Sequence, residues 1–434
     1  MPFYVNVGYK FALEPTIHPA GSIILASALT MHTLDRRKFD GRYPHLANRL
    51  FDPQLYMAGL DPNKSRKACA NLASYPWFGV SGLDAFDSDE QTQPEWRQDT
   101  EDSIHEVWPR AAVTDIAAIQ DAVRQCVDFQ VRLGCSSLIL PSPLTIDPGT
   151  DYSPELAWLD SAIEYTRREQ HVDIPIFATV GISDGCLRFL EPSRNPLLDL
   201  VLDSVSARPV DGVYIVLEQS QEAPDTKHCG LSTPLISILH LAHLFAKDSG
   251  LRVGVNFLGP FGLACEAAGA EFWATGWYRS LYRCRLADQI AGGRAFPVYW
   301  SFPAALDIHL ESEFDQLARS GTLATMEDLT AASQGLLMAA RARRSASTVP
   351  AWRYSMSNVA SAQEHFLISA VNAENEIARR GPVERIEWVS GWLQGAAVNA
   401  SNVGRELGAG RKTKTGHVQA WADAFAMHRR FHNV

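Results

Sequence analysis

Two carboxylic acids follow short apolar runs in this sequence, and they are the first candidates for chemistry. Asp52 follows Arg-Leu-Phe, and Glu218 ends the run Val-Tyr-Ile-Val-Leu. A carboxyl group among apolar residues is poorly solvated, so its pKa rises and it becomes suited to general acid or base catalysis. Each acid also has a structural alternative. Asp52 precedes Pro53 and is typical of a turn, and Glu218 has Lys227 nearby as an ion-pair partner.

A second group of residues has the properties of a ligand-binding site. Glycine lets the backbone approach a ligand, an arginine guanidinium binds oxyanions, and a tryptophan ring stacks on a planar ring. Asparagine and threonine add hydrogen-bonding groups beside them. We predict a ligand with a planar ring or a phosphate. The predicted ligand-binding residues are Thr179, Asn256, Thr275, Gly276, Trp277 and Arg279.

These residues lie at or just after the ends of eight short apolar runs that alternate with helical patterns. The pattern predicts an α/β protein with a (β/α)8 TIM barrel, in which the carboxyl ends of the strands hold the site. The runs cover residues 23–29, 49–58, 136–143, 174–183, 211–219, 252–259, 270–277 and 295–301.

The barrel is expected to span residues 1–309 and to carry a helical C-terminal extension over residues 310–434. Residues 1–20 are interpreted as an extended lead-in strand or a cap of the barrel. A long insertion, at about 60–112, follows the second predicted strand. Because long connections in compact domains tend to be functional, and because this one contains several aromatic residues, we predict a packed insertion that acts as a lid over the barrel mouth. A helix is expected after it, over residues 113–133.

Several classes of barrel enzyme are excluded by missing residues. The seven cysteines are scattered without a CxxC pair, and the first apolar run contains no histidine, which argues against metal-dependent enzymes. None of the eight lysines lies on a predicted strand, which argues against a Schiff-base aldolase. Neither GxGxxG nor a phosphate-binding GxxxxGK[ST] motif occurs. We therefore predict neither a metal nor a cofactor.

Charge is distributed unevenly along the chain, which has a net charge of −10. Residues 81–106 contain nine acidic residues and one basic residue, and residues 376–434 contain nine basic and five acidic residues. Both segments are interpreted as solvated surfaces. Alternatively, Arg411, Lys412 and Lys414 in the basic segment contact a nucleic acid or an acidic protein partner.

The sequence also gives expectations about location and assembly. The N-terminus does not resemble a signal peptide, and the longest apolar stretch, residues 234–246, contains two histidines and is too short to span a bilayer. We expect a cytoplasmic protein without a membrane contact. The sequence leaves open whether the protein forms a homo-oligomer.

Two segments resemble the tRNA-guanine transglycosylase-like family of TIM barrels. The segment LFDPQLYMAGL is similar to that family's early aspartate segment and places Asp52 at the matching position, and residues 254–285 are similar to its late barrel. The resemblance implies binding of a base or nucleotide. The position of the family's nucleophilic aspartate falls on Trp273 or Ala274, and the Cys-rich zinc motif is missing. Base exchange by the covalent route is therefore not implied.

Two functions follow from these observations. The first is a cytoplasmic TIM-barrel protein that binds a small polar ligand, such as a base or nucleotide, at the barrel mouth as an enzyme of transferase or lyase type. In it, Glu218 and Asp52 are catalytic. The second is a barrel without catalysis that serves as a scaffold or component of a multiprotein system, for example in nucleic-acid modification or phage defence. Whether the protein is an enzyme stays open at this point.

Overall fold

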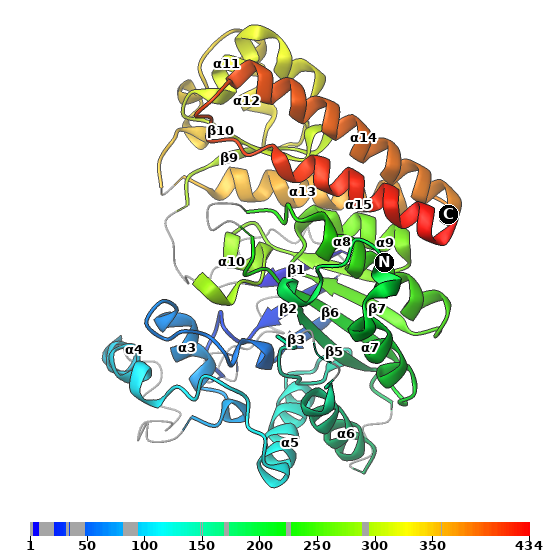
Figure 1. Ribbon diagram of the computed structural model, residues 1–434. Helices are drawn as coiled ribbons and strands as arrows, with labels where there is room; N and C mark the ends of the chain where they lie inside the picture. The colour runs from blue at the N-terminus through cyan, green and yellow to red at the C-terminus, as the bar shows by residue number, and fades with distance from the viewer. Residues whose placement is uncertain are drawn as a thin grey trace.

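The computed structural model describes residues 3–7, 21–31, 34, 48–80, 94–147, 149, 151–168, 173–222, 227–288, 295–356 and 358–434. Eight parallel strands form one sheet in the order β3-β2-β1-β8-β7-β6-β5-β4 (Figure 1). The strands are β1 (Phe3–Val7), β2 (Gly21–Leu25), β3 (Arg49–Asp52), β4 (Leu138–Ile139), β5 (Ile176–Ser183), β6 (Gly212–Glu218), β7 (Arg252–Asn256) and β8 (Phe272–Thr275).

The two ends of this sheet meet, so that it nearly closes into a barrel. The backbone N–H of Ser136, just before β4, donates to the carbonyl oxygen of Arg49 in β3 at 2.9 Å. Strands β5 and β6 are buried along their whole length, as expected for parallel strands with helices outside and side chains inside. The prediction of a TIM-barrel fold with a helical C-terminal extension is confirmed.

Two strand assignments from the sequence are wrong. Phe3–Val7 is a full barrel strand between β2 and β8, whereas we expected only a lead-in or a cap. The predicted eighth strand at 295–301 is not in the barrel. Its residues Val298–Ser301 form β9, which pairs antiparallel with β10 (Leu306–His309) in a separate two-stranded sheet. Both segments are short and apolar, and local pattern does not say which sheet a strand joins.

The long insertion therefore follows the third strand of the barrel, β3, and not the second. Its aromatic residues form part of the core: Tyr75 and Trp77 lie within 6 Å of the ring of Phe51, measured between ring centroids. The helix α5 (Ile116–Arg132) begins after Asp115, whose carboxylate accepts a hydrogen bond from the N–H of Ala118 at 3.0 Å. The acidic residues 81–93 lie outside the described residues.

Helices cover the outside of the barrel, as Figure 1 shows. No helix in the part of the chain that the structure describes combines the length and apolar character that a bilayer span requires. The helices of the barrel and its insertion are α3 (Arg66–Ala73), α4 (Pro94–Val107), α5 (Ile116–Arg132), α6 (Ser153–Arg168), α7 (Pro196–Ser206), α8 (Ser232–Lys247), α9 (Gly262–Ala268) and α10 (Arg279–Tyr282).

The C-terminal extension packs on the side of the barrel formed by α8 and α9 (Figure 1). Trp421 fixes this contact, because its indole N–H donates to the carbonyl oxygen of Cys229 at 2.8 Å. The predicted boundary at residue 309 follows the β9–β10 hairpin. The helices of the extension are α11 (Glu313–Ser320), α12 (Gln334–Arg341), α13 (Ala360–Ala378), α14 (Pro382–Leu407) and α15 (Gly416–His432).

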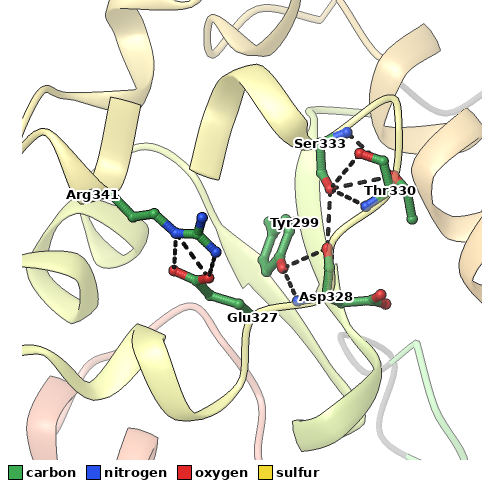
Figure 2. A network of polar contacts seen from close by, with 6 residues as sticks. All are labelled: Tyr299, Glu327, Asp328, Thr330, Ser333 and Arg341. Carbon is green, nitrogen blue, oxygen red and sulfur yellow. Dashed lines mark hydrogen bonds and ion pairs between the residues drawn. The ribbon is translucent and has the colours of Figure 1, made fainter. Parts of the chain in front are cut away.

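A polar network stabilises the extension internally, as Figure 2 shows. The hydroxyl groups of Tyr299 and Ser333 both donate to the carbonyl oxygen of Asp328, each at 3.0 Å. The Arg341 guanidinium pairs with Glu327 beside them. The polar groups of this network satisfy one another across β9, the loop before α12 and α12 itself. We therefore interpret the network as structural.

Candidate functional site

Asp52 lies at the centre of a buried hydrogen-bond network inside the barrel. Its side chain has no exposed surface, and its Oδ2 atom accepts hydrogen bonds from the hydroxyl groups of Tyr56 at 2.6 Å and Tyr214 at 2.8 Å. Its Oδ1 atom accepts from the N–H of Gln54 at 3.0 Å, which is the turn expected from the sequence. Burial raises the pKa of Asp52 to about 6, against the opposing effect of these three donors.

An amide pair holds Tyr214 in this network. The side chains of Asn6 and Asn256 donate to each other, at 2.7 and 3.1 Å. The amide nitrogen of Asn256 also donates to the Tyr214 hydroxyl at 2.5 Å, and its oxygen accepts from the N–H of Phe257 at 2.7 Å. We predicted Asn256 as a ligand-binding residue. In the structure its amide is used fully inside the barrel, where it positions Tyr214.

The chain adopts unusual backbone conformations on both sides of the network. Gln54, after β3, has a φ of 54°, and Phe257, after β7, has a φ of 63°. Residues other than glycine rarely adopt this left-handed region, and such strain is typical of functional sites. Here each strained N–H donates to a network residue, Asp52 in one case and Asn256 in the other. The strain therefore orients the carboxyl group and the amide.

Glu218 ends β6 and is also buried. Its Oε2 atom accepts from the Ser183 hydroxyl at 2.8 Å, and its Oε1 atom accepts from the Ser220 hydroxyl and, at 3.0 Å, from the N–H of Leu286. The alternative partner Lys227 pairs instead with Asp307, at 3.1 Å. Glu218 thus ties the ends of β5 and β6 to the segment after α10.

Asp184 lies next to Glu218 and forms a second carboxyl group at this end of the barrel. Burial, and after it the negative charge of Glu218, raises the pKa of Asp184 to about 7. Both of its oxygens accept from the N–H of Gln221, at 3.0 and 3.1 Å. Asp184 thus places an acid that titrates near neutral pH beside Glu218.

A cavity of about 640 Å³ opens at the barrel mouth, and we call it the mouth cavity. Its walls are mainly apolar and come from the ends of β3 and β4, from the insertion, from α5 and α6, and from Leu286 after β8. Tyr56 belongs both to this wall and to the Asp52 network. Its place depends on Gly181 in β5, because a Cβ atom there would lie 3.3 Å from the Cβ of Tyr56. Residues 110–114, at the end of the insertion and just after it, line the cavity, and the role of the insertion as a lid stays a prediction.

The two threonines predicted to bind a ligand, and the glycine predicted to approach a phosphate, do not line the mouth cavity. Thr179 donates to the carbonyl oxygen of Leu140 on the neighbouring strand at 2.6 Å. Thr275 is buried, and the N–H of Gly276 donates to the carbonyl oxygen of Leu281 at 3.0 Å. The side chain of Leu281 fills the space beside Gly276, since a Cβ atom there would lie 2.5 Å from it. The chain itself therefore occupies the place where we expected a phosphate.

Trp277 lies beside a second cavity, of about 260 Å³, where the barrel meets the extension. It is 3% exposed and does not line the mouth cavity. Arg279 begins α10, but its side chain lies outside the described residues. The predicted ligand-binding residues are thus divided between the barrel interior and this second cavity.

The structure describes all seven cysteines and shows them as buried thiols outside any disulfide. Within the described ranges, no group of three or more histidine, cysteine, aspartate or glutamate side chains has a geometry that could hold a metal ion. In the basic segment, Lys412 pairs with Glu311, and Arg411 donates to the carbonyl oxygen of Gly408 at 2.9 Å. The contact with nucleic acid stays a prediction.

Sequence reasoning missed the two tyrosines of the network. Tyr56 follows Asp52 by four residues, and this short spacing was an available signal. Tyr214 is separated from Asp52 by 162 residues and lies in an apolar run, where its hydroxyl gave no pattern. Only the closed barrel brings it to the carboxyl group.

Comparisons with known protein families, curated proteins and solved structures find no match for this chain. The resemblance to the tRNA-guanine transglycosylase-like family therefore stays a prediction. At the position of that family's nucleophile, Trp273 is fully buried, and its indole N–H donates to Glu374 at 3.0 Å.

Proposed function

We propose that the mouth cavity binds a small organic ligand with a planar apolar body and one anionic group, and that Asp52 and Tyr56 transfer a proton to or from it. The observation that carries this proposal is the membership of Tyr56 in both the cavity wall and the network of a buried acid. Proton transfer of this kind serves lyases and many transferases.

The Asp52–Tyr56 pair is suited to move a proton near neutral pH. Asp52 has a pKa of about 6, whereas burial and the nearby Asp52 raise the pKa of Tyr56 well above its ordinary value. Tyr56 therefore stays protonated and donates to the carboxylate. When a ligand group gives a proton to the Tyr56 oxygen, the Tyr56 proton passes to Asp52, and the reverse transfer restores the pair.

The cavity wall suggests the shape and charge of the ligand. Tyr56 and Trp158 supply aromatic surface, and most other lining residues are aliphatic. Arg110 alone is charged among the described lining residues, and it is exposed near the C-terminal end of the insertion. A single guanidinium fits one carboxylate, sulfonate or phosphate group. Glu218 acts here as a positioning residue, because it holds the N–H of Leu286 in the wall.

A fluorescent dye tests the binding site directly. The dye 1-anilinonaphthalene-8-sulfonate has a planar apolar body and one anion, and N-phenyl-1-naphthylamine is its neutral analogue. We expect Ala112→Trp, which fills the cavity from the insertion, to weaken binding of both dyes by about tenfold, or roughly 1.4 kcal/mol. The matched control Ala117→Trp places the same ring on the exposed face of α5 and should leave binding unchanged.

Comparing the charged and the neutral dye tests whether Arg110 binds the anionic group of the ligand. Arg110→Ala should weaken binding of the sulfonate dye and leave the neutral analogue unaffected. Asp52→Asn should retain both dyes, because Asp52 lies behind the wall. Native mass spectrometry of the protein purified at low salt would then identify a bound metabolite. Unchanged dye affinity in Ala112→Trp, with the fold intact by circular dichroism, would refute the mouth cavity as the binding site.

A further inference from the structure

Two buried glutamates meet where the helical extension packs on the barrel. Glu266 lies in α9, on the outside of the barrel, and Glu374 lies in α13 of the extension. The two side chains come within hydrogen-bonding reach of each other, although they are far apart in the sequence. Neither residue lines the mouth cavity or the second cavity. The pair therefore belongs to the contact between the two parts of the chain.

Both carboxyl groups are removed from water. Glu266 is 4% exposed and Glu374 is 5% exposed. Three of their four oxygen atoms, both of Glu266 and Oε1 of Glu374, have no hydrogen-bond partner among the described residues. Ionised carboxylates only accept hydrogen bonds, so two ionised groups would leave these three oxygens unsatisfied and would bury two negative charges side by side.

The neighbours of the pair do not compensate two negative charges. The remaining oxygen, Oε2 of Glu374, accepts from the indole N–H of Trp273 at 3.0 Å. Nη1 of Arg385, from α14, lies 3.6 Å from Oε1 of Glu266, which is too long for a hydrogen bond, and the Arg385 side chain is 33% exposed. One partly solvated guanidinium balances one buried carboxylate and not two.

Charged groups around the pair act on it in both directions. Burial, and after it the negative charge of Glu374, raises the pKa of Glu266. Arg385 opposes this rise, and the amino group of residue 1, which lies outside the described residues, opposes it less. On α8, which also packs on α9, His243 is hydrogen-bonded to the backbone of Ala268. The effects that raise the pKa prevail, so Glu266 keeps a proton at neutral pH.

A single proton resolves the conflict between the two glutamates. When Glu266 is protonated, its O–H can donate to an oxygen of Glu374, which already accepts from Trp273 and so remains the acceptor. The pair then carries one negative charge, which Arg385 balances. Two neighbouring carboxyl groups in other proteins share a proton for the same reason, since both cannot ionise at close range.

We propose that Glu266 and Glu374 share one proton, and that this proton makes the docking of α13 on the barrel sensitive to pH. While the proton is bound, an O–H···O hydrogen bond joins α9 to α13. As the pH rises, the proton passes to the solvent, the two carboxylates repel each other across the contact, and the extension is held less firmly. This device is separate from the mouth cavity and does not depend on its function.

The stability of the full-length protein gives the first test. In the unfolded chain Glu266 is ionised above its ordinary pKa of 4.5, whereas the folded chain keeps the proton, so stability falls as the pH rises. Glu266→Gln keeps a donor toward Glu374 and has no proton to lose. Between about pH 6 and pH 8, we expect the unfolding equilibrium constant of the unchanged protein to increase by up to about tenfold per pH unit relative to this variant, measured with urea.

A matched control uses a glutamate that is already ionised. Its hydrogen bond with Arg252 lowers the pKa of Glu271, so Glu271→Gln should show no such change with pH relative to the unchanged protein. A difference in stability between the unchanged protein and Glu266→Gln that does not vary with pH would overturn the proposal.

Infrared spectroscopy detects the proton directly, because the carbonyl stretching band of a protonated carboxyl group is separate from the bands of a carboxylate. At neutral pH, Glu266→Gln should lose one such band, and Glu271→Gln should lose none. In the unchanged protein this band should disappear on titration to alkaline pH, a measurement that needs no variant. A spectrum of Glu266→Gln that keeps every band of protonated carboxyl groups would refute the shared proton.

Proteolysis tests whether the proton controls docking. Arg379 and Arg380 follow α13, and trypsin cleaves after arginine. From about pH 7 to pH 9, we expect cleavage there to accelerate in the unchanged protein relative to Glu266→Gln, because local opening exposes the site. The ratio of the two rates at each pH cancels the pH dependence of trypsin itself. A ratio that stays constant would show that the proton does not control docking and would overturn the device.

Discussion

The mouth cavity encloses about 640 Å³ between mainly apolar walls. The second cavity, between the barrel and the extension, which we call the junction pocket, encloses about 260 Å³ between three lysines, two histidines, Asp307 and aromatic rings. In the first, the buried acid is hydrogen-bonded completely and the wall keeps water from it. In the second, Nε1 of Trp277 and Nδ1 of His228 are buried without a hydrogen-bond partner among the described residues. Burial inside a barrel raises the pKa of an acid by desolvation, whereas packing between two parts of a chain can bury polar atoms without giving them a partner.

The largest expected effect on stability comes from breaking the Lys227–Asp307 ion pair beside the junction pocket. Asp307→Ala leaves the ammonium group of Lys227 in a largely buried place without its carboxylate, and we expect a loss of roughly 3–5 kcal/mol in the free energy of unfolding. Urea unfolding measures it. As a control, Glu271→Ala removes the exposed partner of Arg252 and should cost about 1 kcal/mol or less. Equal losses for the two variants would show that the junction pair has no special role.

Acid should loosen the extension more than the barrel mouth. Four histidines, His240, His243, His428 and His432, meet between α8 and α15, with Asp199, Lys247 and Asp248 around them. Burial, and after it the neighbouring histidines, lowers the pKa of His428 to about 3 and that of His432 to about 4.

These pKa shifts determine whether stability rises or falls with pH. The unfolded chain binds protons at these histidines below about pH 6.5, and the folded chain does not, so stability falls as the pH decreases from 6.5 toward 4. Asp52 acts in the opposite direction, because its raised pKa favours the folded state as the pH falls below 6. The raised pKa of Asp184 acts in the same direction as that of Asp52, so the contribution of the histidines is measured as a difference between the protein and a histidine variant. We expect His428→Leu to gain stability relative to the unchanged protein as the pH falls from 6.5 to 4, measured by calorimetry. A stability difference between the two proteins that does not change with pH would contradict the assignment.

A smaller effect tests the network behind the mouth cavity. Asp52→Asn replaces one carboxylate oxygen, which accepts a hydrogen bond, with an amide NH2 group, which only donates. This group would face another donor, either the N–H of Gln54 or a tyrosine hydroxyl. We expect a loss of about 1–2 kcal/mol in the free energy of unfolding. Tyr214→Phe, which removes one donor and keeps the ring, should cost no more. A stabilised Asp52→Asn variant would indicate that the carboxyl group is protonated at neutral pH.

The smallest effect concerns the internal network of the extension. Arg341→Ala removes the partner of Glu327 at the edge of the network in Figure 2, where the guanidinium is more than half exposed. We expect little change in the melting temperature, measured by thermal unfolding, because solvent screens an exposed ion pair. A larger loss would mean that this network, and not the junction pair, holds the extension to the barrel.

The sequence predicted the places of the two acids but not the sheet that two of the strands join. Asp52 and Glu218 lie buried at strand ends, where the apolar runs placed them, because a parallel strand between two layers requires apolar residues along its length. The strand at Phe3–Val7 and the false barrel strand at 295–301 were not distinguishable by pattern. Each is short and apolar, and only pairing with β2 and β8, or with β10, decides its sheet.

The sequence by itself determined the periodic burial of strands and helices, and with it the α/β barrel, the packed insertion and the helical extension, because burial of apolar side chains follows local periodicity. The tertiary structure alone decided the sites. Tyr214 reaches Asp52 across the closed barrel, and Lys412 reaches the junction pocket because the extension folds back on the barrel. Contacts over such separations depend on which surfaces pack together, and no local pattern of residues encodes that choice.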